Sequence, residues 1–398
     1  MAPIKGQLFA LTLSGCGGLV STTLTQFSAV LAFLLSVAAA AQTPPESPEW
    51  AARPVGGGQV RVAVPAPQDP SFSHLAWPKA IRAGDGTIIL AYLAGKFHGG
   101  GGSPAVSRSS DDGKTFSPPQ ILRRFGPGMD YTNSGNLAIG TAKDGALVLL
   151  AMAQAGDRHN MIFGWRSVDA GVSWAPTDTS ALGPDLTGSV TGNIIQVPGV
   201  GLMATGHYRA GSHPYTQGIW IARSTDDGRS WQPPQQVNAV DGGEPVLIRA
   251  AGRLLIFIRG RGTSHQYLAV SDDSGLTWRT SISSIAAEAP KGHGLAHPFA
   301  EPDPENPDAV IMLTAERPLP GRVWFWRGDA RSLEWNRVQP ILDFPQIPGD
   351  AHDDFGYTWM IPKADGRHWL VFYYHGLKMG ANAIWVAEVQ LPSAAPVH

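Results

Sequence analysis

Residues Ser224–Trp231 read STDDGRSW, and this chain of 398 residues contains four further variants of the segment. In chain order, the five segments are SSDDGKTF (Ser109–Phe116), SVDAGVSW (Ser167–Trp174), STDDGRSW (Ser224–Trp231), SDDSGLTW (Ser271–Trp278) and the degenerate GDARSLEW (Gly328–Trp335). Their terminal aromatic residues lie 47 to 58 residues apart. A period of this size is typical of stacked supersecondary units that bury their faces against one another.

The residue types in this segment suit a tight turn. An Asp carboxylate accepts backbone N–H bonds across a turn, Gly supplies a positive φ, and Trp packs against the adjacent unit. Calcium binding is the alternative interpretation, but no bidentate Glu follows at the twelfth position and no helices are expected to flank the segments. We therefore expect structural roles for four carboxylates, which are Asp111, Asp169, Asp226 and Asp273.

Runs with strand character lie between these segments, paired around turn signals, as in PVLIRAAGRLLIFIRG (245–260). Adding the hairpin of the turn segment gives four antiparallel strands per repeat, and repeats start near residues 74, 130, 187, 242, 295 and 352. The pattern predicts an all-β fold, a six-bladed β-propeller over residues 59–392. The early strand Gln59–Val64 would complete the last blade and close the ring.

The N-terminal region has the pattern of an export signal. Lys5 is followed by apolar stretches that end at Phe27–Ala41, with small residues before Gln42. We expect residues 1–41 to be a signal peptide, 42–58 a flexible lead-in and 393–398 a tail. A lipoprotein anchor at Cys16, in LSGC, is the alternative. Both predict export to the periplasm or the extracellular space, without a membrane span once the leader is removed.

Composition excludes several other classes of protein. Cys16 is the only cysteine, so the mature chain would have no disulfide, thiol nucleophile or cysteine metal site. The formal net charge of −2 does not resemble the basic footprint of a nucleic-acid-binding protein. We expect no cofactor and no metal.

The repeated turn segment orients every blade and so sorts the remaining residues between two faces. Ten of the twelve histidines precede a first strand or lie in the loop between second and third strands. Glu244 and Arg259 flank one hairpin symmetrically and should face each other, as should Tyr357 and Tyr373 or Tyr374. Polar loops also collect histidine for no functional reason, but the aggregate predicts a ligand site on this face.

With these segments in view, the chain resembles the sialidase superfamily of six-bladed propellers over its whole mature length. EPVLIRAAGRLLIFIR (244–259) resembles the sialidase segment with a catalytic Glu and a carboxylate-binding Arg, which implies these roles for Glu244 and Arg259. Arg322 resembles a further arginine of the family's carboxylate-binding triad. Tyr357 resembles its nucleophile, and Asp130 resembles a residue that binds a sugar hydroxyl.

Two elements of the family pattern are missing from this chain. The first arginine of the triad is replaced by Ala76, in LAWPKAI. The next loop, KFHGGGGSP (Lys96–Pro104), lacks the family's acid/base Asp, and His98 is the candidate to replace it. Asn193 and His207 complete the predicted substrate-binding residues.

The resemblance implies a secreted exo-glycosidase that hydrolyses terminal acidic sugars, such as sialic acid, and retains the anomeric configuration. Tyr357 would be the nucleophile, Glu244 its base and His98 the acid/base, while two arginines would bind a carboxylate. The first alternative is a lyase on uronate-containing glycans that uses His and Tyr. The second is a glycan-binding propeller without turnover. In each case we expect a monomer with a glycan as its partner.

Overall fold

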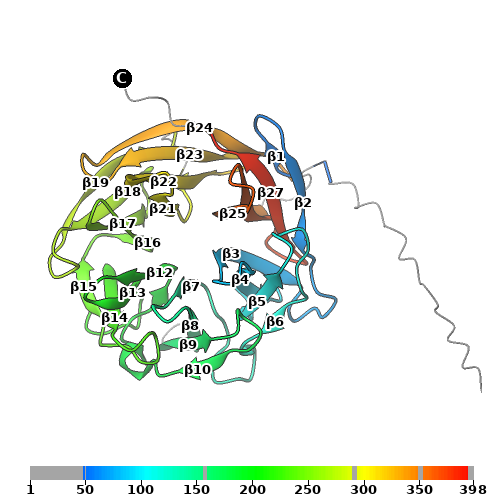
Figure 1. Ribbon diagram of the computed structural model, residues 1–398. Coiled ribbons are helices and arrows are strands. Elements are labelled where there is room, and N and C mark those ends of the chain that lie inside the picture. The colour runs from blue at the N-terminus through cyan, green and yellow to red at the C-terminus, as the bar shows by residue number, and fades with distance from the viewer. Residues whose placement is uncertain (1–47, 50, 156–158, 289–293, 348–352, 393–398) are drawn as a thin grey trace, which may run out of the picture. The chain divides into compact units, whose positions relative to one another are not determined.

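Almost every regular element of the protein is a β-strand, as the paired apolar runs predict. The computed structural model describes residues 48–49, 51–155, 159–288, 294–347 and 353–392 (Figure 1). Within these ranges the only helix is the 3-10 turn Ser180–Leu182 (η1), and no helix is long and apolar enough to cross a membrane. The predicted leader 1–41, Cys16 and the tail 393–398 lie outside the described residues.

The first half of the fold contains three antiparallel meanders. Meander one consists of β3 (His74–Arg82), β4 (Ile88–Gly95), β5 (Ser103–Ser109) and β6 (Gln120–Ile121). Meander two consists of β7 (Leu137–Thr141), β8 (Leu147–Ala155), β9 (His159–Ser167) and β10 (Ala175–Thr177). Meander three consists of β12 (Gly192–Val197), β13 (Gly201–His207), β14 (Ile219–Ser224) and β15 (Gln235–Asn238), with β11 (Ser189–Val190) also paired to β13.

The second half repeats this plan with longer strands. Meander four consists of β16 (Gly242–Ala250), β17 (Arg253–Gly260), β18 (His265–Ser271) and β19 (Arg279–Ala286). Meander five consists of β20 (Gly294–Leu295), β21 (Phe299–Asp303), β22 (Asn306–Arg317), β23 (Gly321–Asp329) and β24 (Glu334–Phe344). Meander six consists of β25 (Asp353–Pro362), β26 (His368–Leu377), β27 (Ile384–Gln390) and β2 (Gln59–Val64).

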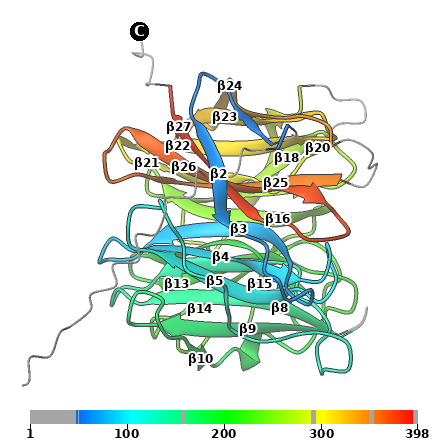
Figure 2. The ribbon, with the colours of Figure 1, turned by 90° about the vertical axis from the view of Figure 1, so that its right-hand side faces the viewer.

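The meanders are arranged around a ring, with first strands such as β3, β7, β12, β16 and β25 nearest its centre (Figure 1). The ring closes through β2, which pairs antiparallel with β27 although the two lie at opposite ends of the described chain (Figure 2). This closure was predicted, and it removes a free sheet edge. The all-β propeller class is therefore confirmed.

The sheets differ from the prediction of six separate blades. The described strands form five hydrogen-bonded sheets, three with four strands, one with six and one with nine. The nine-stranded sheet contains meanders two and three, because Gly192–Ile194 of β12 pairs in parallel with Ala138–Gly140 of β7. Gly140 permits this close approach, since a Cβ there would lie 1.8 Å from the carbonyl oxygen of Ile194.

The described part of the predicted lead-in is ordered. Arg53–Pro54 form a short strand, β1, that pairs antiparallel with β24. Ala51 and Ala52 are buried. Residues 53–55 of the predicted lead-in therefore bond to meander five, whereas Gly56–Gly58 are exposed.

The repeated turn segments each join the third and fourth strands of a meander. In the segment at Asp169, the carboxylate accepts hydrogen bonds from Ser167 Oγ at 2.8 Å and from the Ser173 N–H at 2.9 Å. Ala170 and Gly171 both have positive φ, of 52° and 79°. Asp111, Asp226 and Asp273 accept the equivalent bonds. The four carboxylates are thus engaged within their own turns.

Candidate active site

The site begins with a backbone feature that three first strands share. Trp77, Glu244 and Tyr357 have φ of 56°, 50° and 48°, a region that bulky residues rarely occupy. Each lies at a β-bulge, where the pairing register with the second strand shifts, between Ala76/Lys79, Gly243/Val246 and Gly356/Trp359. A bulge leaves one residue out of the ladder and redirects its side chain.

The bulges bring Glu244 and Tyr357 together from meanders four and six. The Tyr357 hydroxyl donates a short hydrogen bond to Glu244 Oε1. Arg259 Nη1 donates to Glu244 Oε2 at 2.8 Å and lies 3.4 Å from the Tyr357 hydroxyl. Across the ladders, Arg259 pairs with Gly243 and Tyr374 with Gly356, one residue from the predicted partners, because of the bulges.

Burial and charge act in opposite directions on these groups. Burial alone would raise the pKa of Glu244, but the adjacent Arg259 guanidinium and the Tyr357 hydrogen bond outweigh it and hold that pKa well below its usual range. Burial, reinforced by the Glu244 charge, raises the pKa of Tyr357. The phenol is therefore neutral at neutral pH, while the carboxylate is ionised.

A second group of charges lies beside Tyr357. Asp354 Oδ1 pairs with Arg317 Nη2 at 2.7 Å, and Asp354 Oδ2 accepts from the Tyr374 hydroxyl at 2.8 Å. His98 Nδ1 lies 3.3 Å from the same Oδ2. The Arg317 guanidinium is 5.5 Å from the centre of the Tyr357 ring. Arg317 and Arg259 thus both approach the tyrosine.

Aromatic rings enclose this pair of clusters. The Trp77 ring lies 6.0 Å from the Tyr357 ring and 4.9 Å from the imidazole of His98. The His297 ring stacks on Tyr357 at 5.4 Å, and its Nε2 lies 2.7 Å from Thr191 Oγ1. His98 thus lies near Tyr357 through the Trp77 ring, and its partner Asp354 reaches Tyr357 by way of Arg317.

Lys79 is a buried cation that the sequence did not single out. Its side chain is fully buried, and its Nζ has no hydrogen-bond partner within the described part of the chain. The Nζ lies 4.8 Å from the centre of the Trp359 ring and 5.9 Å from that of Tyr357. Burial lowers the pKa of Lys79 to about 7, even though the Glu244 charge acts to raise it.

Two recesses open beside Glu244. The larger, of about 560 Å³, is lined by His207, Glu244, Arg259 and Arg261 and by the loop from Gly260 to Ser264. The smaller, of about 380 Å³, shares His207, Glu244 and Arg261 and adds Arg209 and Asn136. Tyr357 is only 6% exposed and lines neither recess. Of the three groups in the Glu244–Arg259–Tyr357 cluster, Glu244 is thus the one that lines both recesses.

The remaining predicted residues are placed differently. His207 is close to the cluster, since its Nδ1 accepts the Glu244 N–H at 3.1 Å, and burial lowers its pKa to about 3. Arg322 does not join the cluster: it is half exposed and pairs with Asp343 at 2.9 Å. The reason is strand parity. Arg322 pairs across the ladder with Glu316, so these two side chains share one face of the sheet. Arg317 directly follows Glu316, and its side chain therefore projects to the opposite face.

Asp130 and Asn193 also lie apart from the cluster. Asp130 is exposed in the loop between β6 and β7. Asn193 Nδ2 donates to the Ala300 carbonyl at 3.2 Å, and the residue lines a separate recess with Glu301. His207, the other predicted substrate-binding residue of meander three, pairs with Ser189 of β11 rather than with Asn193. Of the predicted histidines, His293 and His352 lie outside the described residues.

A sequence signal for the additional residues was present. Trp77, Glu244 and His297 each precede a proline at the start of a meander, in AWPK, GEPV and AHPF. Proline cannot donate to a strand ladder and occurs in sheets at edges, strand starts and bulges, which marks an irregular point of the strand. Lys79 and Asp354 carry no comparable signal.

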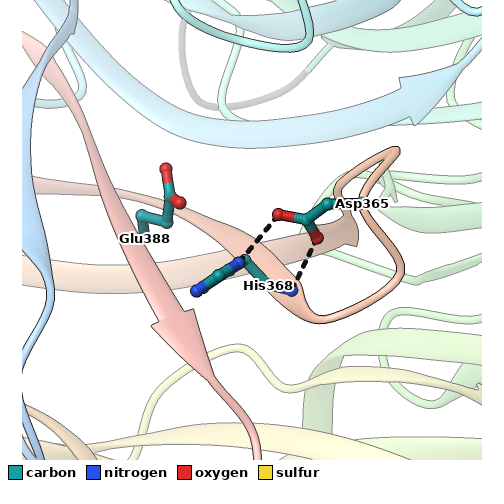
Figure 3. Close-up of side chains that lie close together, drawn as sticks. All are labelled: Asp365, His368 and Glu388. Atoms are coloured by element: carbon teal, nitrogen blue, oxygen red, sulfur yellow. Dashed lines mark hydrogen bonds and ion pairs between the residues drawn. The ribbon is translucent and has the colours of Figure 1, made fainter.

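On the opposite turns, three potential metal ligands lie close together. Ligand atoms of Asp365, His368 and Glu388 lie within 4.8 Å of one another. Figure 3 shows the Asp365 carboxylate bonded to His368, at 2.7 Å from its Nδ1, while Glu388 comes from the neighbouring strand. Glu388 already pairs with Lys363 at 2.8 Å, and His368 Nε2 lies 3.1 Å from Gln390. These groups satisfy one another without a cation.

Comparison with known proteins agrees with this architecture. A family model described as a BNR repeat-like domain matches residues 61–242. No match was found among curated proteins.

Solved structures match over most of the chain. A protein of unknown function from Dyadobacter fermentans is 18% identical, with a TM-score of 0.62 over 86% of this chain and 99% of that one. The NanB sialidase from Streptococcus pneumoniae is 14% identical, with a TM-score of 0.61 over 84% of this chain and 71% of that one. The sialidase of Trypanosoma rangeli is 17% identical, with a TM-score of 0.59 over 84% and 59%.

Identities this low show the fold and not the activity. What they show is that this chain has the β-propeller fold of these sialidase structures, with a BNR repeat-like match over residues 61–242.

Proposed function

We propose that this protein is an exported retaining exo-glycosidase that removes a terminal acidic sugar, sialic acid or a relative, from glycans. The observation that carries the proposal is the contact of the Tyr357 hydroxyl with Glu244, which Arg259 holds in place. A buried phenol bonded to an ionised carboxylate is the arrangement that a tyrosine nucleophile needs. Export rests on the leader pattern in residues 1–41.

Two arginines would bind the carboxylate of the sugar. Arg259 lies 3.4 Å from the Tyr357 hydroxyl, and Arg317 lies 5.5 Å from the centre of its ring. Guanidinium groups bind carboxylates through charge-assisted bonds. Arg317 thus takes the role in this proposal that the sequence suggested for Arg322.

Substrate binding would itself prepare the base. In the free protein the Arg259 charge holds the pKa of Glu244 low, which makes that carboxylate a weak base. A substrate carboxylate on Arg259 adds a nearby negative charge and competes for the same guanidinium. Both effects raise the pKa of Glu244 and favour transfer of the Tyr357 proton to it.

In the first chemical step, Tyr357 Oη would form a bond to the anomeric carbon as the glycosidic C–O bond breaks. Glu244 takes the phenol proton, and His98 donates a proton to the leaving oxygen. Burial lowers the pKa of His98, and Asp354, 3.3 Å from its Nδ1, acts against that shift and towards the protonated imidazole that this step requires. Water then attacks the anomeric carbon as its bond to Tyr357 Oη breaks, while His98 takes a proton from the water and Glu244 returns its proton to the phenolate.

One observation favours a second candidate, a lyase acting on uronate-containing glycans. His98 is paired with a carboxylate, and its loop contains no acidic residue. A His–Asp pair beside a tyrosine could remove a proton next to a carboxylate that the arginines neutralise. An unsaturated uronate product would identify this activity.

The test is a panel of fluorogenic glycosides: a sialoside, a glucuronide and an uncharged galactoside. We expect the wild-type protein to release the fluorophore from an acidic glycoside only, and Tyr357→Phe to release none. Proton NMR of the first-formed sugar should show retention of configuration. Turnover that survives in Tyr357→Phe would refute the proposal, and folded wild-type protein that hydrolyses none of the acidic glycosides would leave only binding or lyase activity.

A further inference from the structure

Two arginines beside Glu244 have no carboxylate partner among the described residues. Arg209 follows β13 and Arg261 follows β17. Among the described residues, the one side-chain hydrogen bond that the Arg209 guanidinium makes is to Met152 Sδ, at 3.6 Å from its Nη1. By contrast, Arg259 is paired with Glu244 and Arg317 with Asp354.

Arginines with structural roles in this fold are satisfied differently. Arg108, Arg166 and Arg223 each donate to a backbone carbonyl of the next meander's turn segment, at 2.8, 3.1 and 2.7 Å. Arg209 and Arg261 make no such bond with the described backbone. Their guanidinium groups are therefore not used to join meanders.

Both residues line recesses beside Glu244, with Arg209 half-buried and Arg261 exposed. They line the smaller recess together with that carboxylate, and Arg261 also lines the larger one. Arg261 Nη2 would lie only 3.3 Å from a Cβ at Gly243, so its guanidinium lies close against the strand that carries Glu244. The absence of a side chain at position 243 makes room for it.

The two arginines also repel each other. Burial, together with the charge of Arg261, lowers the pKa of Arg209. The Glu244 charge acts to raise that pKa, but this carboxylate is already paired with Arg259, so a further anion bound beside Arg209 and Arg261 would relieve their repulsion. Meanders three and four carry this pair, while Arg317 and Tyr357 belong to meanders five and six, with Glu244 between the two groups.

The geometry points to a second anion-binding subsite formed by Arg209 and Arg261, so that the substrate carries a second anionic group besides the carboxylate bound by Arg259 and Arg317. This inference rests on the proposed function for its sugar chemistry. The second group is a carboxylate or a sulfate ester, placed across Glu244 from Tyr357. The natural substrate is then a dianionic acidic glycan rather than a singly charged sialoside.

Equilibrium binding tests the subsite without requiring turnover. Calorimetry on Tyr357→Phe protein would compare sialyllactose with a sulfated sialyllactose and with disialyllactose, which carries a second carboxylate. We expect one dianionic ligand to bind roughly tenfold more tightly than sialyllactose, as one added charge-assisted bond provides. Whichever ligand gains identifies the second anion.

Variants then assign the gain to the two arginines. Arg209→Gln and Arg261→Gln should remove the roughly tenfold advantage while leaving sialyllactose binding within about twofold, and Arg261→Lys should restore part of it. Arg367→Gln is the matched control, since Arg367 is exposed in the β25–β26 turn. Equal binding of all three ligands, or an advantage that survives both substitutions, would overturn the subsite.

Failure of the proposed function would look different. If no sialylated ligand binds, the sugar assignment fails, and titration with inorganic sulfate decides the subsite alone. Sulfate should then stabilise the wild-type protein against heat more than it stabilises the Arg209→Gln/Arg261→Gln variant, and equal stabilisation of both would refute it.

Discussion

The two ends of the meanders repeat in different ways. At one end, four turns place an aspartate in the same geometry, and each carboxylate is satisfied by Ser or Thr groups of its own turn. At the other end, the same backbone bulge recurs with different side chains, Trp77, Glu244 and Tyr357, whose contacts cross between meanders.

This difference separates scaffold from site. A turn satisfied locally can be copied into each repeat without regard to its neighbours. A bulge that points a side chain to the centre of the ring places one residue per meander in a shared space. The turn residue stays the same from meander to meander, whereas the bulge residue differs. This difference converts a repeated scaffold into one asymmetric site.

The largest expected effect comes from removing the carboxylate at a bulge. Glu244→Gln should lower kcat by a factor on the order of 10²–10⁴, because the amide cannot accept the Tyr357 proton. Asp169→Asn, the same chemical change in a turn segment, should leave kcat within about twofold. Steady-state kinetics on both variants checks this. Equal losses of kcat would contradict the proposal that one end of the meanders forms the site and the other end is scaffold.

The next effect distinguishes two arginines at one hairpin. Arg317→Gln should lower kcat/KM by roughly 10- to 100-fold, because a charge-assisted contact to the substrate carboxylate is lost. Arg322→Gln should change it by less than about twofold, since that side chain pairs with Asp343 at the surface. If the two variants exchanged their effects, Arg322 would belong in the site as the sequence suggested.

Lys79 should make stability depend on pH. Its pKa is lowered from 10.5 to about 7 in the folded protein, so the unfolded chain binds more protons between these values. Stability should therefore rise with pH from about 7 to 10, by roughly 1.4 kcal/mol per pH unit. Urea unfolding at several pH values measures this slope, which Lys79→Met should abolish; an unchanged slope in the variant would show that Lys79 is not its source.

The smallest effect is expected in the turn segments. Asp169→Ala should cost about 1 kcal/mol in the free energy of unfolding, through the loss of the hydrogen bonds to Ser167 and Ser173. Hydrogen bonds with Ser173 and Ser167 lower the pKa of Asp169 to about 2, so this contribution is present above pH 4 and is lost as the pH falls through 2. A variant that is equally destabilised at pH 2 and pH 7 would contradict this origin.

Much of the fold follows from residues adjacent in the sequence. The turn segments fix where third and fourth strands meet, and the pairing of β2 with β27 follows from the need to close the ring. The meeting of Glu244, Arg259 and Tyr357 also follows from hairpin register and the family resemblance. These features depend on local spacing, which the sequence displays directly.

The rest depends on geometry that spacing does not determine. Arg317 and Arg322 flank the same turn, and which of them faces the site depends on the parity of one strand. The positive φ of Trp77 and the burial of Lys79 depend on packing between meanders that are distant in the sequence. The pairing of His98 with Asp354 joins a loop of meander one to strand β25 of meander six for the same reason.

The most direct test of the account is to trap the sugar on the enzyme. The protein would be incubated with a fluorinated acidic-sugar donor whose glycosyl-enzyme intermediate hydrolyses slowly, and its peptides examined by mass spectrometry. We predict one added sugar on the peptide that contains Tyr357 and none on the Tyr357→Phe variant. A sugar attached to another residue, or no adduct from protein that hydrolyses acidic glycosides, would contradict the central claim that Tyr357 is the nucleophile.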